Sequence, residues 1–300
     1  MSNLAYIFPG QGSQYVGMGK DLFEQNEQAR VMFMQADKLL GISLSKICFE
    51  GPEEELRQTK NTQPAIFLHS VILSKLLDEQ NVSMVAGHSL GEYSALVYAG
   101  ALSFEDGLKI VRLRGELMQR AGELQPGTMA AVVGLESNIL ESVCTEASAE
   151  GIVQCANFNS PGQIVISGSV AGVKKAMELA KVRGAKLVKE LVVSGAFHSP
   201  LMEYAVEGLS KALDAITIND ATIPVYANVT AKPVTKATEI RQLLKDQLTK
   251  PVRWEESMKN MVADGVKKFV EVGPGKVLQG LVKRIGASVE VSGVDKILDA

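Results

Sequence analysis

The pentapeptide Gly87-His88-Ser89-Leu90-Gly91 is the feature that most constrains the fold of this chain. A short apolar run at 83–86 precedes it, and an apolar segment suited to a helix follows at once at 90–98. A GxSxG sequence in this position is typical of a sharp strand-to-helix turn, in which the glycines let strand and helix approach closely. The pattern therefore predicts an α/β fold in which the serine projects from a tight turn.

Outside this turn, short apolar runs alternate with longer helical segments. Strands are expected at 4–8, 223–229 and 268–272, and helices at 14–40, 63–80, 104–121 and 200–215, with a last helix reaching Arg284. Alternation of this kind indicates a sheet whose central strands are parallel.

Residues 127–195 follow a different order of strands and helices. Strands are expected at 129–133, 152–157, 163–167 and 185–193, and helices at 137–149 and 170–183. The order βαββαβ is the ferredoxin-like pattern. We therefore expect a hydrolase-like large α/β domain with a parallel central sheet, formed by 1–126 and 196–300, and a small ferredoxin-like domain inserted at 127–195.

Composition excludes several classes of protein. The net charge of −3 does not indicate a basic surface, so nucleic acid is not an expected partner. No apolar stretch reaches the roughly 20 residues of a membrane span, and the N-terminus does not read as a signal peptide. The three cysteines form no CxxC pair, so no metal site is expected. An odd, low number of cysteines fits a reducing compartment, and we expect a cytoplasmic protein.

Ser89 is the candidate nucleophile. The helix that begins at Leu90 directs its N-terminal amides and its dipole toward the same point, where they would stabilise an oxyanion. The alternative is that the pentapeptide is a plain turn without a catalytic role.

A serine hydroxyl needs a base at neutral pH, and the chain has three histidines. His69 lies in an apolar helix, and His88 lies in the tight turn with its side chain expected to point away from the Ser89 hydroxyl. His198 lies in a loop between a strand and a helix start, so we favour it as the base. Asp106 and Glu190 could orient it, although neither has a distinctive context. A backbone carbonyl could do so instead, which would make a dyad.

Seven motifs then occur in order along the chain, and together they resemble the malonyl-CoA:acyl carrier protein transacylases. They are Phe8-Pro9-Gly10-Gln11-Gly12-Ser13-Gln14, Gly87-His88-Ser89-Leu90-Gly91-Glu92-Tyr93, Arg114-Gly115-Glu116-Leu117-Met118, Asn157-Phe158-Asn159-Ser160-Pro161-Gly162-Gln163, Gly195-Ala196-Phe197-His198-Ser199, Gln247 ahead of Pro251-Val252-Arg253-Trp254, and Glu271-Val272-Gly273-Pro274-Gly275.

The resemblance implies a role for each matching position in the reaction itself. Ser89 would be the acylated nucleophile and His198 its base. The backbone amides of Gln11 and Leu90 would form the oxyanion hole. The main-chain carbonyl of Gln247 would orient the histidine, which would explain the missing acid.

Other matching positions would bind the substrate. Arg114 would pair with the free malonyl carboxylate, although helical phase alone does not choose it over Arg112 or Arg120. Phe197 would narrow the pocket beside the substrate α-carbon, and Asn159 would lie at the mouth of the cleft between the domains. Thr249 and Lys250 stand before Pro251, where family members often show an aromatic and a small polar residue. We expect this departure to have no functional effect; contact of Lys250 with coenzyme A phosphates or the carrier protein is the alternative.

The implied activity moves a malonyl group from malonyl-CoA to the phosphopantetheine thiol of acyl carrier protein for fatty acid synthesis, without a metal or redox cofactor. Three alternatives remain: a trans-acting acyltransferase of a polyketide synthase, a serine thioesterase or other hydrolase, and a non-catalytic carrier-binding module.

Overall fold

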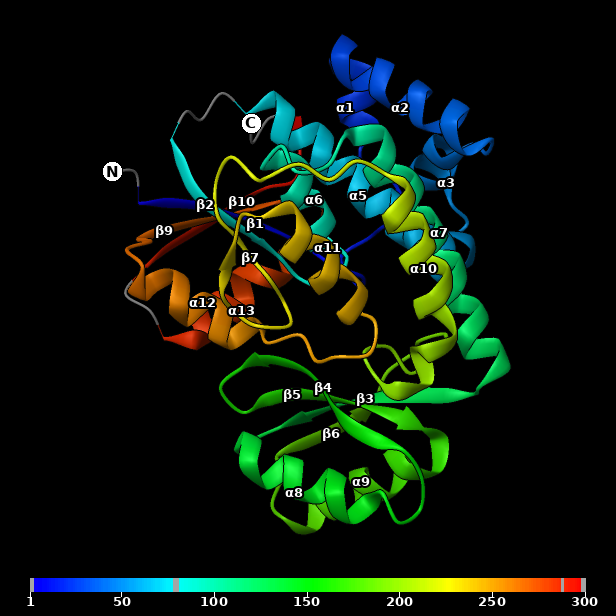
Figure 1. Ribbon diagram of the computed structural model, residues 1–300, viewed down its shortest axis with the longest axis vertical. Helices are drawn as coiled ribbons and strands as arrows, with labels where there is room; N and C mark the ends of the chain where they lie inside the picture. Colours follow the sequence, from blue (N-terminus) through cyan, green and yellow to red (C-terminus); the bar gives the residue numbers. More distant parts are fainter. Residues whose placement is uncertain (1–2, 78–80, 287–288, 298–300) are drawn as a thin grey trace.

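The protein contains two sheets, which a computed structural model describes for residues 3–77, 81–286 and 289–297 (Figure 1). The larger, six-stranded sheet has the order β10-β9-β1-β2-β7-β8. All its neighbouring strands pair in parallel except β7 and β8. Its strands are β1 (Leu4–Phe8), β2 (Val82–Gly87), β7 (Val225–Tyr226), β8 (Pro233–Val234), β9 (Lys268–Val272) and β10 (Glu290–Val294). The expected α/β fold with parallel central strands is confirmed.

Strand β1 shows why this sheet is buried on both faces. Tyr6 and Phe8 belong to one apolar cluster, and Ala5 and Ile7 belong to another. Successive side chains of a strand point to opposite faces, so a continuous apolar run needs helices on both sides.

The helices lie on both faces of this sheet and beside it (Figure 1). Side chains of α5 and α6 pack in the cluster on one face, and side chains of α12 and α13 pack in the cluster on the other. The helices of this part are α1 (Lys20–Gln25), α2 (Glu27–Leu40), α3 (Leu44–Glu50), α4 (Glu53–Arg57), α5 (Thr59–Leu76), α6 (Gly91–Tyr98), α7 (Phe104–Leu124), α10 (Glu203–Ala215), α11 (Ala237–Asp246), α12 (Trp254–Ala263) and α13 (Val277–Ile285), with a 3₁₀ turn at Pro200–Met202.

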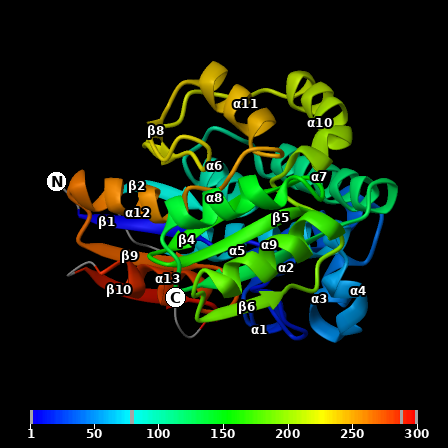
Figure 2. The same ribbon diagram turned by 90° about the horizontal axis from the view of Figure 1, so that it is seen from below.

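The second sheet is antiparallel and has the order β4-β5-β3-β6. Its elements follow one another as β3 (Gly127–Val133), α8 (Ser137–Ala147), β4 (Val153–Ser160), β5 (Gln163–Ser169), α9 (Val170–Val182) and β6 (Leu187–Glu190). It has an apolar cluster of its own. Figure 2, a view from below, shows α8 and α9 against this sheet.

A short stretch of backbone joins the two parts directly. The N–H of Val252 donates to the carbonyl of Ala156 at 2.8 Å, and the N–H of Phe158 donates to the carbonyl of Val252 at 2.9 Å. Strand β4 is therefore fixed to the segment before α12, which sets the smaller sheet against the carboxyl ends of β1 and β2.

Several expected elements differ from the observed ones. The helix expected at 14–40 is two helices, because the Asn26 side chain accepts the Ala29 N–H at 3.0 Å and starts α2 anew. The strands expected at 223–229 and 185–193 shorten to β7 and β6.

The helix expected at 63–80 begins earlier, at Thr59, and its helical part ends at Leu76; residues 78–80 lie outside the described residues. Helices α3 and α4 and strands β8 and β10 were not expected.

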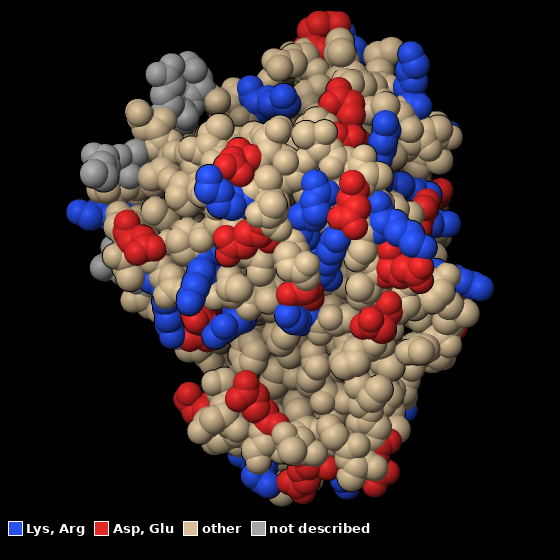
Figure 3. Space-filling model, viewed as in Figure 1, with Lys and Arg blue, Asp and Glu red and all other residues tan. Residues whose placement is uncertain are grey.

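The surface carries no dominant charge on the face shown in Figure 3. Lysines and arginines alternate there with aspartates and glutamates, and neither sign forms a continuous patch. In the described part of the chain, no helix has both the length and the apolar character needed to cross a membrane.

Candidate active site

Ser89 lies at the turn between β2 and α6, as the GxSxG pattern predicts. Its φ is +51°, in the left-handed region that residues other than glycine rarely adopt. Glycine is required on both sides: a Cβ on Gly87 would lie 1.9 Å from the carbonyl carbon of Gly91, and a Cβ on Gly91 would lie 2.1 Å from the carbonyl oxygen of Phe8. The turn is therefore a strained strand-to-helix elbow that presents the serine hydroxyl.

His198 is the histidine that reaches this hydroxyl. Its Nε2 lies 2.8 Å from Ser89 Oγ, and its Nδ1 lies 2.8 Å from the main-chain carbonyl oxygen of Gln247. Since a carbonyl can only accept, Nδ1 carries the proton and Nε2 is free to accept one from the serine. The geometry is that of a serine–histidine dyad oriented by a peptide carbonyl.

Neither of the two carboxylates considered as a third catalytic group contacts this imidazole. The carboxylate Oε1 of Glu190 accepts from the Thr128 hydroxyl at 3.0 Å. Asp106 lies in the first turn of α7, where its backbone N–H donates to the Ser103 hydroxyl.

The other two histidines lie elsewhere. His69 is buried in α5, and burial lowers its pKa to about 4. His88 Nε2 lies 2.8 Å from Asn159 Oδ1, and its ring packs against Trp254. His88 thus links the elbow to strand β4 and does not contact the nucleophile.

The environment of His198 keeps its imidazole neutral. Burial, and secondly the nearby Arg114 guanidinium, lower the pKa of His198 to about 3, while the hydrogen bond to Gln247 opposes the shift. A neutral imidazole can accept a proton across the physiological pH range.

We expect the His198 ring to remain unprotonated down to a pH of about 5. The folded pKa lies below the unfolded value, so the unfolded chain takes up this proton first as pH falls, and the contribution of this group to stability declines from about pH 7 downward. Imidazole NMR shifts, assigned by comparison with a His198→Gln variant, would measure the titration. A midpoint near 6.5 would contradict the expectation.

Arg114 comes from α7, and its side chain is 1% exposed. Its Nη2 lies 3.1 Å from Ser89 Oγ and 2.9 Å from Gln247 Oε1, and its Nη1 lies 2.7 Å from Gln63 Oε1. The guanidinium also lies 5.6 Å from the centre of the Tyr93 ring. A fixed, buried cation therefore stands beside the nucleophile, in a position to bind a carboxylate.

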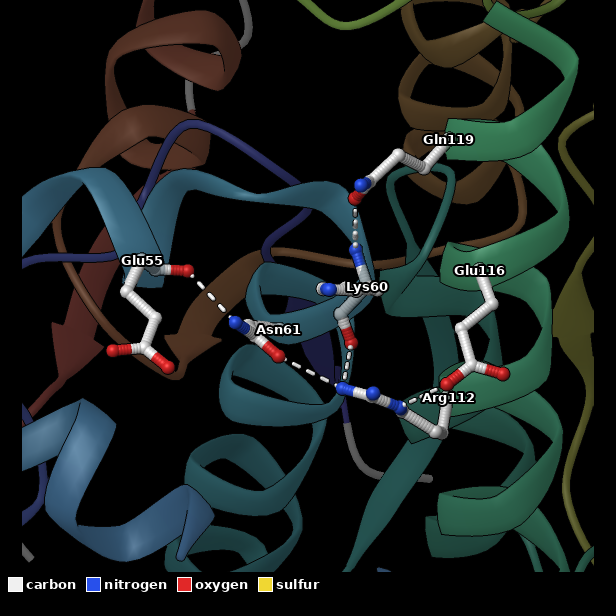
Figure 4. Close-up of polar contacts among 6 residues, drawn as sticks. All are labelled: Glu55, Lys60, Asn61, Arg112, Glu116 and Gln119. Carbon is white, nitrogen blue, oxygen red and sulfur yellow. Dashed lines mark hydrogen bonds and ion pairs between the residues drawn. The ribbon is translucent and has the colours of Figure 1, made fainter. Parts of the chain in front are cut away.

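Arg112 instead donates a hydrogen bond to the backbone of α5 (Figure 4). Pro64 has no N–H to donate to the carbonyl of Lys60, four residues earlier in the helix. Arg112 Nη1 donates to that carbonyl at 2.9 Å and to Asn61 Oδ1 at 2.8 Å. Arg120 forms an exposed ion pair with Glu123. The structure thus selects Arg114 among the three arginines left open by the sequence.

A cavity of about 240 Å³ lies between the two parts of the molecule and contains Ser89, His198 and Arg114. Gln11, Leu90 and the apolar side chain of Phe197 also line it, and the smaller sheet supplies part of the wall. Residues from the smaller sheet in this lining are Met129, Asn157, Asn159, Gln163 and Val165. The candidate residues Ser89, His198, Gln11, Leu90, Arg114, Phe197 and Asn159 therefore line one cavity, and Gln247 lies behind it in contact with His198 and Arg114.

Two buried amides that were not expected help to hold this geometry. The N–H of Ser89 donates to Asn228 Oδ1 at 2.6 Å, and Asn228 Nδ2 donates to the carbonyl of Gly87 at 2.7 Å. Gln63 accepts from Arg114, as described above. The one signal for Gln63 was a polar residue within an apolar helical segment.

The Lys250 side chain makes its ion pair outside the catalytic contacts. Its ammonium pairs with Asp246 at 2.6 Å, and its side chain is half exposed.

Within the described ranges, no group of three or more histidine, cysteine, aspartate or glutamate side chains is arranged to hold a metal ion.

The strained elbow and the contact between Ser89 and His198 define a serine-nucleophile site, part of whose wall comes from the smaller sheet. The family model of the acyl transferase domain matches residues 5–297, and the chain belongs to that family. Its curated relatives include the malonyl CoA-acyl carrier protein transacylase of Bacillus subtilis, 49% identical over 98% of this chain and 94% of the relative, and that of Haemophilus influenzae, 45% identical over 99% and 96%.

Solved structures agree with this placement. An acyl carrier protein S-malonyltransferase from Vibrio cholerae superposes with a TM-score of 0.95 at 43% identity, covering 99% of this chain and 98% of the other. A malonyl-transacylase in complex with a type II polyketide synthase acyl carrier protein has a TM-score of 0.95 at 39% identity, covering 99% and 97%.

Proposed function

We propose that this protein transfers the malonyl group of malonyl-CoA to the phosphopantetheine thiol of acyl carrier protein and so supplies fatty acid synthesis. The observation that carries the proposal is the buried Arg114 guanidinium, 3.1 Å from the nucleophile Ser89 Oγ. Of the acyl groups that a serine could accept, one with a free carboxylate is best matched by this cation. The names of the relatives point to the same acyl group.

The first half-reaction forms a malonyl-serine ester. His198 Nε2 takes the proton from Ser89 Oγ, which attacks the thioester carbonyl carbon. The main-chain N–H groups of Gln11 and Leu90 receive the negative charge on the carbonyl oxygen. As the C–S bond breaks, His198 returns the proton to the leaving coenzyme A sulfur.

The second half-reaction reverses these steps with another thiol. His198 takes the proton of the phosphopantetheine thiol, the sulfur attacks the ester, and Ser89 Oγ leaves and regains the proton. Gln247 holds the imidazole through its carbonyl in both halves, and Arg114 fixes the malonyl carboxylate. The exchange of one thioester for another needs no net oxidation, so we propose no metal or redox cofactor.

The walls of the cavity set the acyl group that fits. Phe197 is 7% exposed and lines the cavity next to His198, and we propose that it limits space beside the malonyl α-carbon. Asn159, through its contact with His88, ties the wall from the smaller sheet to the elbow.

Replacing Phe197 with serine is expected to raise the methylmalonyl-to-malonyl ratio of transfer rates about tenfold, because the smaller side chain leaves room for a methyl branch. Competition between the two coenzyme A thioesters, with the acylated carrier analysed by mass, gives the ratio directly. An unaltered ratio would rule out the steric gate.

We also propose the division into two domains that the sequence predicts. Residues 127–195 are proposed as a ferredoxin-like domain inserted in a hydrolase-like domain of 1–126 and 196–300. The strand order β4-β5-β3-β6 and the separate apolar cluster support this division. A cytoplasmic location is part of the proposal, and the three cysteines, all free thiols, are compatible with a reducing compartment.

One other candidate function, malonyl transfer to a polyketide synthase carrier protein, has a specific observation in its favour. The related malonyl-transacylase bound to a polyketide synthase carrier protein indicates that the same fold can serve that pathway. Rates of malonyl transfer to a fatty acid carrier and to a polyketide carrier, compared at equal concentration, distinguish the two.

The time course of the acyl-enzyme tests transfer against hydrolysis. A transferase keeps the malonyl-serine ester until a thiol arrives, whereas a thioesterase loses it to water. We expect the ester to persist in buffer and to disappear on addition of the holo carrier protein. Rapid release of free malonate without a carrier would support the hydrolase instead.

A further inference from the structure

The buried carboxylate of Glu92, three residues after the nucleophile, takes no part in the mechanism described above. We propose that Glu92 is a positioning residue: through the side-chain amide of Gln247 it holds the Arg114 guanidinium in place without neutralising it, and so determines the preference for an acyl group with a free carboxylate. The inference rests on the proposed function and extends it to a specificity device behind the cavity.

Glu92 is fixed by backbone and side-chain donors. It lies on α6 and is 3% exposed. Its Oε2 accepts from the backbone N–H of Asn228 at 3.0 Å and from Gln247 Nε2 at 2.9 Å. Burial raises the pKa of Glu92 to about 7, against these hydrogen bonds and the Arg114 charge, which lower it.

These contacts set the orientation of the Gln247 amide. Gln247 is fully buried, and its Nε2 donates both to Glu92 and to the carbonyl of Ser89, at 3.1 Å. Both N–H groups are thus directed to acceptors, and Oε1 is left to face Arg114 Nη2 at 2.9 Å. In the flipped amide, the NH₂ group would meet the guanidinium N–H groups, donor against donor.

The Gln247 amide lies between Glu92 and Arg114 and keeps the two charged groups from pairing directly. None of the ion pairs found in the described residues includes Arg114, although its guanidinium is buried. A carboxylate in direct contact would satisfy the cation and compete with the substrate. A carboxyl group one amide away orients the partner of the cation and leaves the guanidinium to bind an incoming carboxylate.

The same amide belongs to the residue that orients the base. The main-chain carbonyl of Gln247 accepts from His198 Nδ1, while its side chain contacts Arg114. Loss of the Gln247 side chain removes the link to Arg114 but keeps the peptide carbonyl. Glu92 and Gln247 therefore act on the acyl carboxylate through one chain of contacts, which predicts that their effects are not additive.

The test is single-turnover loading of the intact protein with malonyl-CoA and, separately, with acetyl-CoA, whose acyl group has no charge. In Glu92→Ala, malonyl loading is expected to fall about 100-fold, since a displaced clamp misplaces the reacting carbon, while acetyl loading falls about fivefold or less. Gln247→Leu is expected to lower the malonyl-to-acetyl ratio to a similar extent, and the double variant no further.

Two more variants separate positioning from folding. Glu92→Gln keeps the shape and an uncharged acceptor, so the ratio is expected to fall about tenfold, and this variant carries the test if Glu92→Ala does not fold. The matched control is Glu271→Gln: Glu271 is also a buried glutamate with a pKa raised to about 7, but it accepts from the N–H groups of Leu278 and Gln279. Its ratio is expected to stay within about twofold of wild type.

The outcomes separate the role of Glu92 from the proposed function itself. Equal losses with malonyl-CoA and acetyl-CoA in the Glu92 variants, an unchanged ratio in Glu92→Gln, or multiplicative effects in the double variant would overturn the role of Glu92. If the wild-type protein itself forms no malonyl ester, it is the proposed function that fails.

Discussion

Replacing Ser89 with alanine is expected to lower malonyl transfer to the carrier protein by at least about 10⁴-fold, because no other group can form the ester intermediate. In the described part of the structure the hydroxyl hydrogen-bonds with His198 and Arg114 in the cavity, so the fold should survive its removal. Steady-state transfer rates, with circular dichroism as a check on folding, measure the effect.

The comparison with His198→Ala sharpens this prediction. The two residues act as a unit, so the double variant should be about as slow as the slower single variant. Substantial transfer by Ser89→Ala would favour the non-catalytic carrier-binding alternative over the mechanism above.

Replacing Arg114 with alanine is expected to reduce malonyl loading about 10³-fold and acetyl loading about tenfold or less, because the malonyl carboxylate would enter a buried site with no cation. The guanidinium lies 3.1 Å from Ser89 Oγ, so its loss acts on the reacting group directly. Loading of the two acyl groups from their coenzyme A thioesters gives both factors.

An Arg114→Lys variant is the matched control. It keeps the positive charge but loses the planar fork that also contacts Gln63 and Gln247, so it should recover only part of the malonyl rate. Equal losses for malonyl and acetyl groups in Arg114→Ala would remove the carboxylate-binding role.

The elbow could be predicted because its cause is local. Gly87 and Gly91 are required by contacts within the turn and with β1, and the apolar run before it and the helical segment after it are adjacent in the sequence. The pairing of Ser89 with His198 is not local, since 109 residues separate them. It could be anticipated because the chain has only three histidines to choose from.

The supporting polar groups could not be predicted from pattern alone. Asn228 and Glu92 reach the site through the packing of α6 against the segment after β7, which no periodicity reports. Arg112 and Arg114 are two residues apart on one helix, and their different environments depend on where α5 crosses it. The resemblance to known sequences, rather than helical phase, identified Arg114.

The irregular parts of the fold were missed for related reasons. Strand β8 has two residues, and β10 joins the edge of the sheet beyond β9 as a strand only half buried. Helices α3 and α4 are short and are held by contacts with α2 and α5. Elements of this length depend more on their neighbours than on their own propensity.

The central claim is that the Ser89 hydroxyl, activated by His198, carries the malonyl group between two thiols. The most direct test is the mass of the intact protein after brief exposure to malonyl-CoA, followed by peptide mapping. We predict one added malonyl group, located on the peptide that contains Ser89 and removed by holo carrier protein. An unmodified protein, or a malonyl group on another residue that the carrier does not remove, would contradict the account.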